Sequence, residues 1–320
     1  MSIWDQTYLK NQFDENTQYI SLKEGNTPVD KISSPDTEIL IKREDKNPAG
    51  SWKDRGTAYK LTSLINQKIK EAVLFSSGNA LISILNYCNQ LNLNFKIHAV
   101  VSEHIKPEKL EIIQKLVTDK HQLYISKEPK KEAIRISADL KIPNLRVSID
   151  NEIVKGYWSL GFEIYDLIRN QDNEEIAIFV PASSGTALVG IAEGLLYKTK
   201  NEFKLPRIFV CQTQTVHPFV KENDEEKEEN IGGISTEKSL ADAIVDQVGL
   251  RVSQVQKIAN ETNGDIYAIT NDELESAKRY VDENLVGNFL TYNSLLSVAG
   301  YLRANKTEDF KKVICIASGR

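Results

Sequence analysis

The sequence is poor in cysteine, histidine and long hydrophobic runs, and each shortage excludes a class of protein. The three cysteines, Cys88, Cys211 and Cys315, are odd in number and far apart, so we expect reduced, buried thiols in a cytoplasmic protein. These cysteines and the four histidines form no metal-ligand spacing, so we expect no metal site. No apolar run is long enough to span a bilayer, and no basic segment followed by an apolar one opens the chain, so we expect no membrane span.

The chain also carries little net charge. With 40 Lys and Arg against 45 Asp and Glu, the formal charge is −5, which argues against an electrostatic nucleic-acid surface. The 320 residues suffice for one large domain or two ordinary ones with a sizeable core. The pattern G-x-x-x-x-G-K-[ST] does not occur, so a nucleotide phosphate is the poorer ligand to expect.

Strand and helix patterns alternate along most of the chain. Short apolar runs predict strands at 71–75, 96–101, 122–126, 146–149, 176–181, 208–211, 265–270 and 312–317. Longer amphipathic stretches predict helices at 79–91, 107–116, within 130–140, and at 154–169, 186–198, 272–285 and 291–304. The alternation predicts parallel sheets covered by helices on both faces. The charged run 221–230 predicts a solvated surface loop.

Residues 47–56 read N-P-A-G-S-W-K-D-R-G and are the most informative stretch of the chain. Lys53 follows a Pro/Gly-rich loop and precedes a long helical pattern, so we expect it near a helix start, beside Arg55. The helix dipole and the neighbouring cation both favour a neutral amine on this lysine. A neutral amine is what Schiff-base chemistry needs. The alternative interpretation is a loop with a solvated lysine.

Two later turns between a strand and a helix have the composition of anion sites. Residues 76–80 read S-S-G-N-A, and residues 181–187 read P-A-S-S-G-T-A. The first turn of a helix has unpaired N–H groups and a dipole that favours an anion. Small hydroxyl residues and glycine leave such amides open to a ligand. An ordinary capped helix start remains the alternative for both turns.

Together these segments resemble threonine synthases and their relatives, the tryptophan synthase β-like (fold type II) pyridoxal-phosphate enzymes. In that family the lysine motif reads much like N-P-T-G-S-F-K-D-R-G, and ten ordered positions are hard to match by chance. Residues 21–28 resemble the family's L-x-E-G-N-T-P opening. The resemblance implies an α/β fold with two three-layer αβα domains and mostly parallel sheets. It implies a larger cofactor domain (1–58 plus 147–320), a smaller domain (59–146) and an active site between them.

The resemblance also implies a role for each site residue. Lys53 would hold pyridoxal 5′-phosphate as a Schiff base and serve as general base. Ser318, in the S-G pair after the last strand, would bond the pyridine nitrogen, and a neutral hydroxyl there suits elimination and replacement better than transamination. Asn79 would also bond the cofactor's phenolic oxygen. The cofactor phosphate would lie at Ser183, Ser184, Gly185 and Thr186, and the substrate carboxylate at Ser76, Ser77, Gly78 and Asn79.

The chain departs from the threonine synthase pattern around the substrate. Where that family places an Arg, an Asn and a Thr beside the phosphate of O-phosphohomoserine, this chain has Ile153, Val147 and Ala80. A buried phosphate without charged partners is costly. The family's E-P-[AS]-[SA] segment near the ring is replaced by L-T-Y-N-S at 290–294, so we expect Tyr292 to add bulk there.

The resemblance therefore implies a pyridoxal-phosphate lyase or synthase that acts on a small L-amino acid by elimination or replacement. Threonine synthase is the best single match. A serine/threonine dehydratase or β-replacement enzyme is the alternative, since neither needs the missing phosphate ligands. A non-catalytic cofactor-binding protein is a second alternative, suggested by the altered 290–294 segment and the few residues after Ser318; a nucleotide-binding α/β protein is a third. The resemblance further implies a homodimer.

Overall fold

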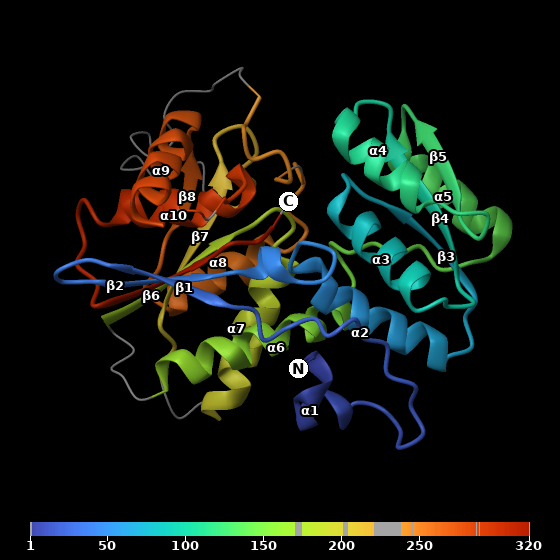
Figure 1. Ribbon diagram of the computed structural model, residues 1–320, viewed down its shortest axis with the longest axis horizontal. Helices are drawn as coiled ribbons and strands as arrows, with labels where there is room; N and C mark the ends of the chain where they lie inside the picture. The colour runs from blue at the N-terminus through green and yellow to red at the C-terminus, as the bar shows by residue number, and fades with distance from the viewer. Residues whose placement is uncertain are drawn as a thin grey trace. The chain divides into compact units, whose positions relative to one another are not determined.

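The computed structural model describes residues 2–169, 175–200, 204–220, 238–244, 246–285, 287 and 289–319 (Figure 1). The chain forms two compact units, one of residues 1–26 with 47–159 and one of residues 27–46 with 160–320. Each unit has its own β-sheet, of three and six strands respectively. The predicted surface loop at 221–230 lies outside the described residues.

The first unit is built on the three-stranded sheet. Its strands are β3 (Glu71–Phe75), β4 (Lys96–Ser102) and β5 (Gln122–Ser126), paired in parallel in that order. Its helices are the short η1 (Ile3–Asp5) and α1 (Thr7–Lys10), then α2 (Lys53–Asn66), α3 (Asn79–Gln90), α4 (Pro107–Leu116), α5 (Pro129–Leu140) and the start of α6 (Asn151–Ile168). Proline stands at the first position of α4 and α5, where its missing N–H costs nothing.

Both faces of the small sheet are covered. Val73 and Val100 pack with Ala133 and Ile136 of α5. Leu74 points to the opposite face, because neighbouring side chains of a strand alternate, and there it lines a pocket with residues of α3. The prediction of parallel strands with helices on both faces is therefore confirmed for this sheet.

The second unit is built on the six-stranded sheet. Its strands are β1 (Val29–Ser33), β2 (Glu38–Lys42), β6 (Ile176–Pro181), β7 (Arg207–Thr213), β8 (Ile266–Ile269) and β9 (Lys312–Ile316). They lie in the order β1-β2-β9-β6-β7-β8, with β1 antiparallel to β2 and the other described pairs parallel. Its other described elements are η2 (Glu44–Lys46), α7 (Thr186–Thr199), α8 (Val252–Glu261), α9 (Asn271–Asn284) and α10 (Tyr292–Ala304).

The large sheet is also covered on both faces. Phe179, Phe209 and Cys315 pack on one face with residues of α9 and α10. Figure 1 shows α7 and α8 on the other side of this sheet, and α8 contacts β7 and α7. A continuous apolar strand such as β6, buried at every position, is what a sheet covered on both faces requires.

The structure corrects one predicted strand and adds elements that the sequence patterns missed. Residues 146–149 do not form a strand: Asn144 makes an isolated bridge with Val73, and the Ile149 N–H then donates to the Arg146 carbonyl, which closes a turn. The hairpin of β1 and β2 and the helix α8 were not predicted. In α8 only Val255 and Ala259 are buried, so its apolar stripe is narrow.

The two compact units divide the chain at other points than the sequence-based boundaries at 58/59 and 146/147. Helix α2 and the start of α6 both belong to the unit with the small sheet. The reason is local: α2 packs on α3, and Lys60 of α2 pairs with Asp150 and Glu152 at the start of α6.

Candidate cofactor site

Lys53 is the first residue of α2, as the sequence predicted. The loop before it turns at Gly50, whose φ of +84° favours glycine. Asp54 is fully buried. One of its carboxylate oxygens accepts from the Ala49 N–H at 2.6 Å, and the other lies 2.5 Å from the Ser83 hydroxyl of α3. The neighbour of Lys53 thus fixes both the loop and the helix start.

Arg55 is fully buried and bonds helix α6. Its Nη1 donates to Ser159 Oγ at 2.9 Å, and Ser159 in turn donates to the Gly156 carbonyl. Arg55 therefore links α2 to α6. Its expected effect on the amine of Lys53 stays a prediction.

Helices α2 and α6 approach each other through glycine. A Cβ atom added at Gly156 would collide with the Arg55 carbonyl oxygen. A Cβ atom added at Gly56 would lie 2.8 Å from Ile153 Cγ2 and 3.2 Å from Tyr157 Cε2. The glycines therefore bring Ile153 and Tyr157 of α6 next to the first turns of α2.

Helix α6 begins where it does because Asp150 caps it. Asp150 Oδ1 accepts from the N–H groups of Glu152 and Ile153 at 2.9 and 3.3 Å, which is the usual way to satisfy a helix start. Its other oxygen lies 2.8 Å from Lys60 Nζ. The cap thus ties α6 to α2 a second time.

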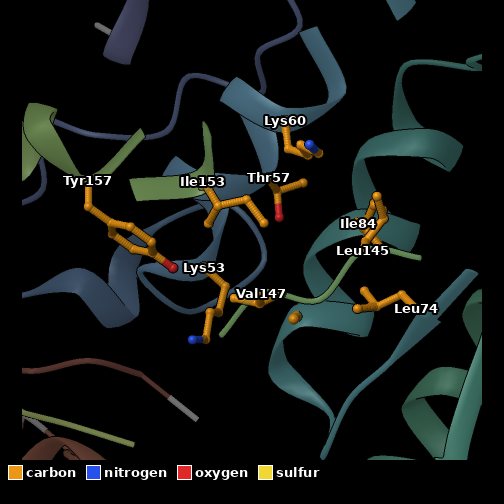
Figure 2. A pocket seen from close by; sticks show the side chains of 11 residues that line it. Lys53, Thr57, Lys60, Leu74, Ile84, Leu145, Val147, Ile153 and Tyr157 are labelled. Carbon is orange, nitrogen blue, oxygen red and sulfur yellow. The ribbon is translucent and has the colours of Figure 1, made fainter. Parts of the chain in front are cut away.

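Lys53 lines a pocket within the first unit (Figure 2). Figure 2 shows the Tyr157 hydroxyl pointing toward the Lys53 side chain. The three positions at which the sequence departs from threonine synthase, Ala80, Val147 and Ile153, all line this pocket. The remaining lining residues are Gly56, Thr57, Lys60, Leu74, Ile84, Leu145 and Tyr157.

Lys60 stands at the pocket wall as an ion-paired ammonium. It donates to Asp150 Oδ2 at 2.8 Å and to Glu152 Oε2 at 2.6 Å. Burial lowers the pKa of Lys60, but the hydrogen bonds to the two carboxylates outweigh burial, so the pKa is raised. Lys60 is therefore charged and already matched by two negative groups. Sequence reasoning missed this set because its members are about ninety residues apart.

The turn of Ser76, Ser77, Gly78 and Asn79 joins β3 to α3, as predicted. Gly78 has a φ of +139°, and its N–H donates to Ser76 Oγ at 3.1 Å. One amide of the expected anion site is thus bonded within the turn. The alkyl chain of Lys109 from α4 lies over Gly78. A Cβ atom added at Gly78 would be 2.9 Å from the Cδ atom of Lys109. The role of this turn in holding a carboxylate stays a prediction.

In the second unit, Ser183, Ser184, Gly185 and Thr186 form the turn from β6 into α7, as predicted. Gly185 caps the helix with a φ of +78°, and an added Cβ would lie 2.7 Å from Val255 Cγ2. Ser184 Oγ lies 3.1 Å from Thr186 Oγ1, and Ser183 Oγ accepts from the Asp246 N–H. A turn with hydroxyl side chains at a helix N-terminus, and with a glycine at the position that has no room for a Cβ, fits a phosphate group.

Arg251 is a residue near this turn that sequence reasoning missed. A Cβ atom added at Gly185 would lie 3.5 Å from the Cβ atom of Arg251, and Arg251 is only 5 % exposed. Its Nη1 donates to Gln254 Oε1 at 2.9 Å. The G-L-R sequence before α8 gave no signal, because a lone arginine without a motif is most often a surface residue.

Ser318 follows β9 and is nearly buried. Its hydroxyl lies 3.3 Å from the Asn293 carbonyl oxygen, and the Gly319 N–H donates to Ser294 Oγ. Thr291 Oγ1 donates to the Gly319 carbonyl at 2.6 Å. The unusual 290–294 segment therefore holds the S-G turn in position.

Tyr292 of the 290–294 segment contacts α9. Its hydroxyl bonds the Glu275 carboxylate of α9, and its ring packs against the core of the second unit. The hydrogen bond to Glu275 raises the pKa of Tyr292. Tyr292 thus packs between α9 and α10, and its effect beside the cofactor ring stays a prediction.

The described residues also bear on metal sites, membrane helices and cysteines. The described part of the chain holds no cluster of His, Cys, Asp and Glu that could bind a metal ion. No described helix is long and apolar enough to cross a membrane. The three cysteines are unpaired and buried, and burial raises the pKa of Cys88 to about 12, so the expectation of buried thiols is confirmed.

Comparison with known proteins agrees with this geometry. The model of the family described as pyridoxal-phosphate dependent enzyme matches residues 20–319. The threonine synthase of Bacillus sp. (strain ULM1) is 24% identical over 314 residues, which cover 95% of this chain and 85% of that protein.

Two solved structures share the fold. Maize serine racemase has a TM-score of 0.74 at 17% identity, over 99% of this chain and 93% of that one. The processed form of threonine deaminase isoform 2 from Solanum lycopersicum has a TM-score of 0.69 at 19% identity, over 92% of this chain and 78% of that one. The prediction of an α/β, fold type II architecture is confirmed.

Proposed function

We propose, from the premise that the chain belongs to the family of pyridoxal-phosphate-dependent enzymes, that it is a lyase or synthase acting on a small L-amino acid by elimination or replacement. The cofactor is pyridoxal 5′-phosphate. The observation that carries the proposal is Lys53 at the first position of α2, lining a pocket beside the turn at 76–79. That arrangement supports a site with one amine at Lys53, a turn proposed to hold the carboxylate, and a pocket proposed for the side chain.

Lys53 holds the cofactor and moves a proton at its Nζ. Pyridoxal phosphate, when bound, supplies a ring that withdraws electrons from the Cα of an attached amino acid. The amine of Lys53, once released, takes the Cα proton as general base. The helix N-terminus under Lys53 favours its neutral form, and Asp54 and Ser83 hold its backbone in place.

Three further groups of residues orient cofactor and substrate in this proposal. Ser76, Ser77, Gly78 and Asn79 take the substrate carboxylate, and Asn79 also bonds the cofactor's phenolic oxygen. The phosphate is held by the turn of Ser183, Ser184, Gly185 and Thr186. Its place at a helix start, with room only for glycine at position 185, supports this. Ser318 pairs with the pyridine nitrogen, and its neutral hydroxyl supports elimination or replacement over transamination.

One observation favours a second candidate within this class, a serine/threonine dehydratase or β-replacement enzyme. The pocket beside Lys53 is lined by Ala80, Val147 and Ile153, which offer no charged partner to a substrate phosphate. Threonine synthase chemistry on O-phosphohomoserine would leave that dianion without ligands here. A substrate with a hydroxyl leaving group needs no charged partner at this place.

The test is to load the protein with pyridoxal phosphate and titrate it with L-serine, L-threonine, L-homoserine and O-phospho-L-homoserine. We expect L-serine or L-threonine to shift the cofactor absorbance and release ammonia and a 2-oxo acid. We expect O-phospho-L-homoserine to bind no better than L-homoserine. Threonine formed from O-phospho-L-homoserine would identify a threonine synthase, and a band that no amino acid shifts would favour the non-catalytic alternative.

We also propose that the protein is a cytoplasmic homodimer. Buried, unpaired thiols support a reducing compartment. The dimer is implied by the family resemblance, and light scattering of the loaded protein tests it: a mass of twice 36.1 kDa supports the dimer, and a mass of 36.1 kDa contradicts it.

A further inference from the structure

The pocket beside Lys53 has fixed apolar walls. Leu74 of β3 and Ile84 of α3 are 2 % and 4 % exposed, and Leu145 is 3 % exposed. The Leu145 N–H donates to the Val73 carbonyl at 2.8 Å, which holds Leu145 beside β3. Ile153 is pressed against Gly56 by the crossing of α6 and α2. These side chains belong to packed elements, so the shape of the pocket is set by the fold.

Two polar groups of the lining, those of Thr57 and Lys60, are already engaged by other residues. The Thr57 hydroxyl lies 2.7 Å from Ser83 Oγ, which itself bonds Asp54. The Lys60 ammonium lies between Asp150 and Glu152. An anion entering beside Lys60 would meet two carboxylates, and like charges repel at this range. The lining therefore disfavours a negative group.

The pocket is also where a substrate side chain would go. Ala80 lines it and directly follows Asn79, the last residue of the turn proposed for the carboxylate. Lys53, the proposed acceptor of the Cα proton, lines it as well (Figure 2). An amino acid held by its carboxylate at the turn and by its Cα at Lys53 has its third substituent directed to the space between them.

We infer that this pocket is the side-chain subsite of the enzyme and that it selects L-amino acids with a short, uncharged side chain, whose apolar part it buries. The inference rests on the proposed function and deepens it. Phosphorylated and carboxylated side chains are rejected, because the pocket would desolvate their charge while the ammonium of Lys60 is already matched by Asp150 and Glu152. Ala80, Val147 and Ile153 are the specificity-determining residues.

The experiment measures the apparent Kd of four probes from the absorbance change of the protein loaded with pyridoxal phosphate. The probes are L-alanine, L-2-aminobutyrate, L-aspartate and O-phospho-L-serine. L-2-aminobutyrate should bind about fourfold more tightly than L-alanine, because one more methylene is buried. The two charged probes should bind weaker than L-2-aminobutyrate by on the order of a hundredfold.

Two variants test the pocket itself. Val147→Arg adds a cation at a half-buried position and should improve O-phospho-L-serine binding about tenfold while weakening L-2-aminobutyrate. Its matched control is Ile149→Arg, on the same segment, 46 % exposed and outside the pocket, which should leave all four Kd values unchanged. Ala80→Leu fills the pocket without adding charge, and should remove the difference between L-2-aminobutyrate and L-alanine. Thermal unfolding of each loaded variant checks that it folds.

The outcomes separate the two claims. If no amino acid changes the absorbance of the loaded wild-type protein, the proposed function fails. If L-alanine and L-2-aminobutyrate bind but O-phospho-L-serine binds as tightly as they do, the function stands and the inference about the pocket is overturned. The inference is equally overturned if folded Ala80→Leu retains the wild-type ratio between L-2-aminobutyrate and L-alanine.

Discussion

The position of Lys53 depends on the buried carboxylate next to it. Asp54 accepts from the Ala49 N–H and bonds the Ser83 hydroxyl, so the lysine follows a loop that is fixed from two sides. Buried charges persist only where such bonds satisfy them. The lysine motif could be identified from the sequence, but its support by Ser83, 29 residues away, could not, since the contact depends on how α2 packs on α3.

At the residue scale, Gly185 gives the sharpest test of the proposed phosphate site. Gly185→Asp should weaken the affinity for pyridoxal phosphate, because it sets a like charge beside the phosphate and its Cβ meets Val255. Gly185→Ala is the matched control, since it brings the same Cβ at φ +78° without the charge. We expect the Gly185→Asp variant to bind the cofactor about tenfold less tightly than the Gly185→Ala variant, as measured by absorbance titration. Equal affinities would contradict a phosphate at this turn.

Glu273 predicts a pH dependence of stability. It accepts from Arg303 Nε at 2.7 Å and Nη2 at 2.6 Å, and from the Thr270 N–H at 2.8 Å. Burial raises the pKa of Glu273, but these hydrogen bonds outweigh burial, so the pKa lies below its ordinary value of 4.5. A carboxyl whose pKa falls on folding adds stability above the unfolded pKa, and this stability is lost as the pH falls through the folded pKa.

Glu273→Gln should therefore cost about 1–2 kcal/mol in the free energy of unfolding at pH 7, and the cost should shrink below pH 4.5. Urea unfolding of both proteins at several pH values between neutrality and strong acid measures it. A cost that does not change with pH would mean that the charge of Glu273 contributes nothing.

At the scale of elements, the crossing of α2 and α6 positions the pocket. Gly156→Ala would drive a methyl group into the backbone carbonyl of Arg55, whereas Gly56→Ala would meet the Cγ2 methyl group of the Ile153 side chain. Backbone cannot yield as a side chain can, so Gly156→Ala should cost about 2–3 kcal/mol. Gly56→Ala should cost less, because the gain of about 1 kcal/mol in helix propensity offsets the contact. Denaturant midpoints of the two variants test the order, and the reverse order would contradict the crossing.

The elements also differ in how much the sequence predicted of them. The helix α9 was expected at 272–285 from its amphipathic pattern, which is a local signal. In the structure, a capping box of Thr270 and Glu273, with both of its hydrogen bonds present, fixes the start of α9. The hairpin strand β2 was missed: it ends in Lys42, which is buried and pairs with Glu163 at 2.7 Å. From the sequence alone, a lysine is expected at the surface, because its partner in the fold lies far along the chain.

For the whole molecule, the parallel pairing of most strands and the placement of the turns before α3 and α7 followed from the alternation of elements, whereas the order of the strands in each sheet was not predicted. Helices begin at the carboxyl ends of parallel strands, so ligand-binding turns gather there. The partition of the chain into units did not follow, since it depends on contacts such as Lys60 with Asp150 and Glu152. The substrate pocket likewise required the structure, because Ala80, Val147 and Ile153 meet only after folding.

The central claim is that Lys53 is the residue that holds the cofactor. The most direct measurement is reduction of the protein loaded with pyridoxal phosphate by borohydride, followed by digestion and mass mapping of the modified lysine. We expect the added mass on the peptide that contains Lys53, and its loss in Lys53→Ala, while the exposed Lys46→Ala retains it. Added mass on another lysine of the wild-type protein, or full modification of Lys53→Ala, would contradict the account.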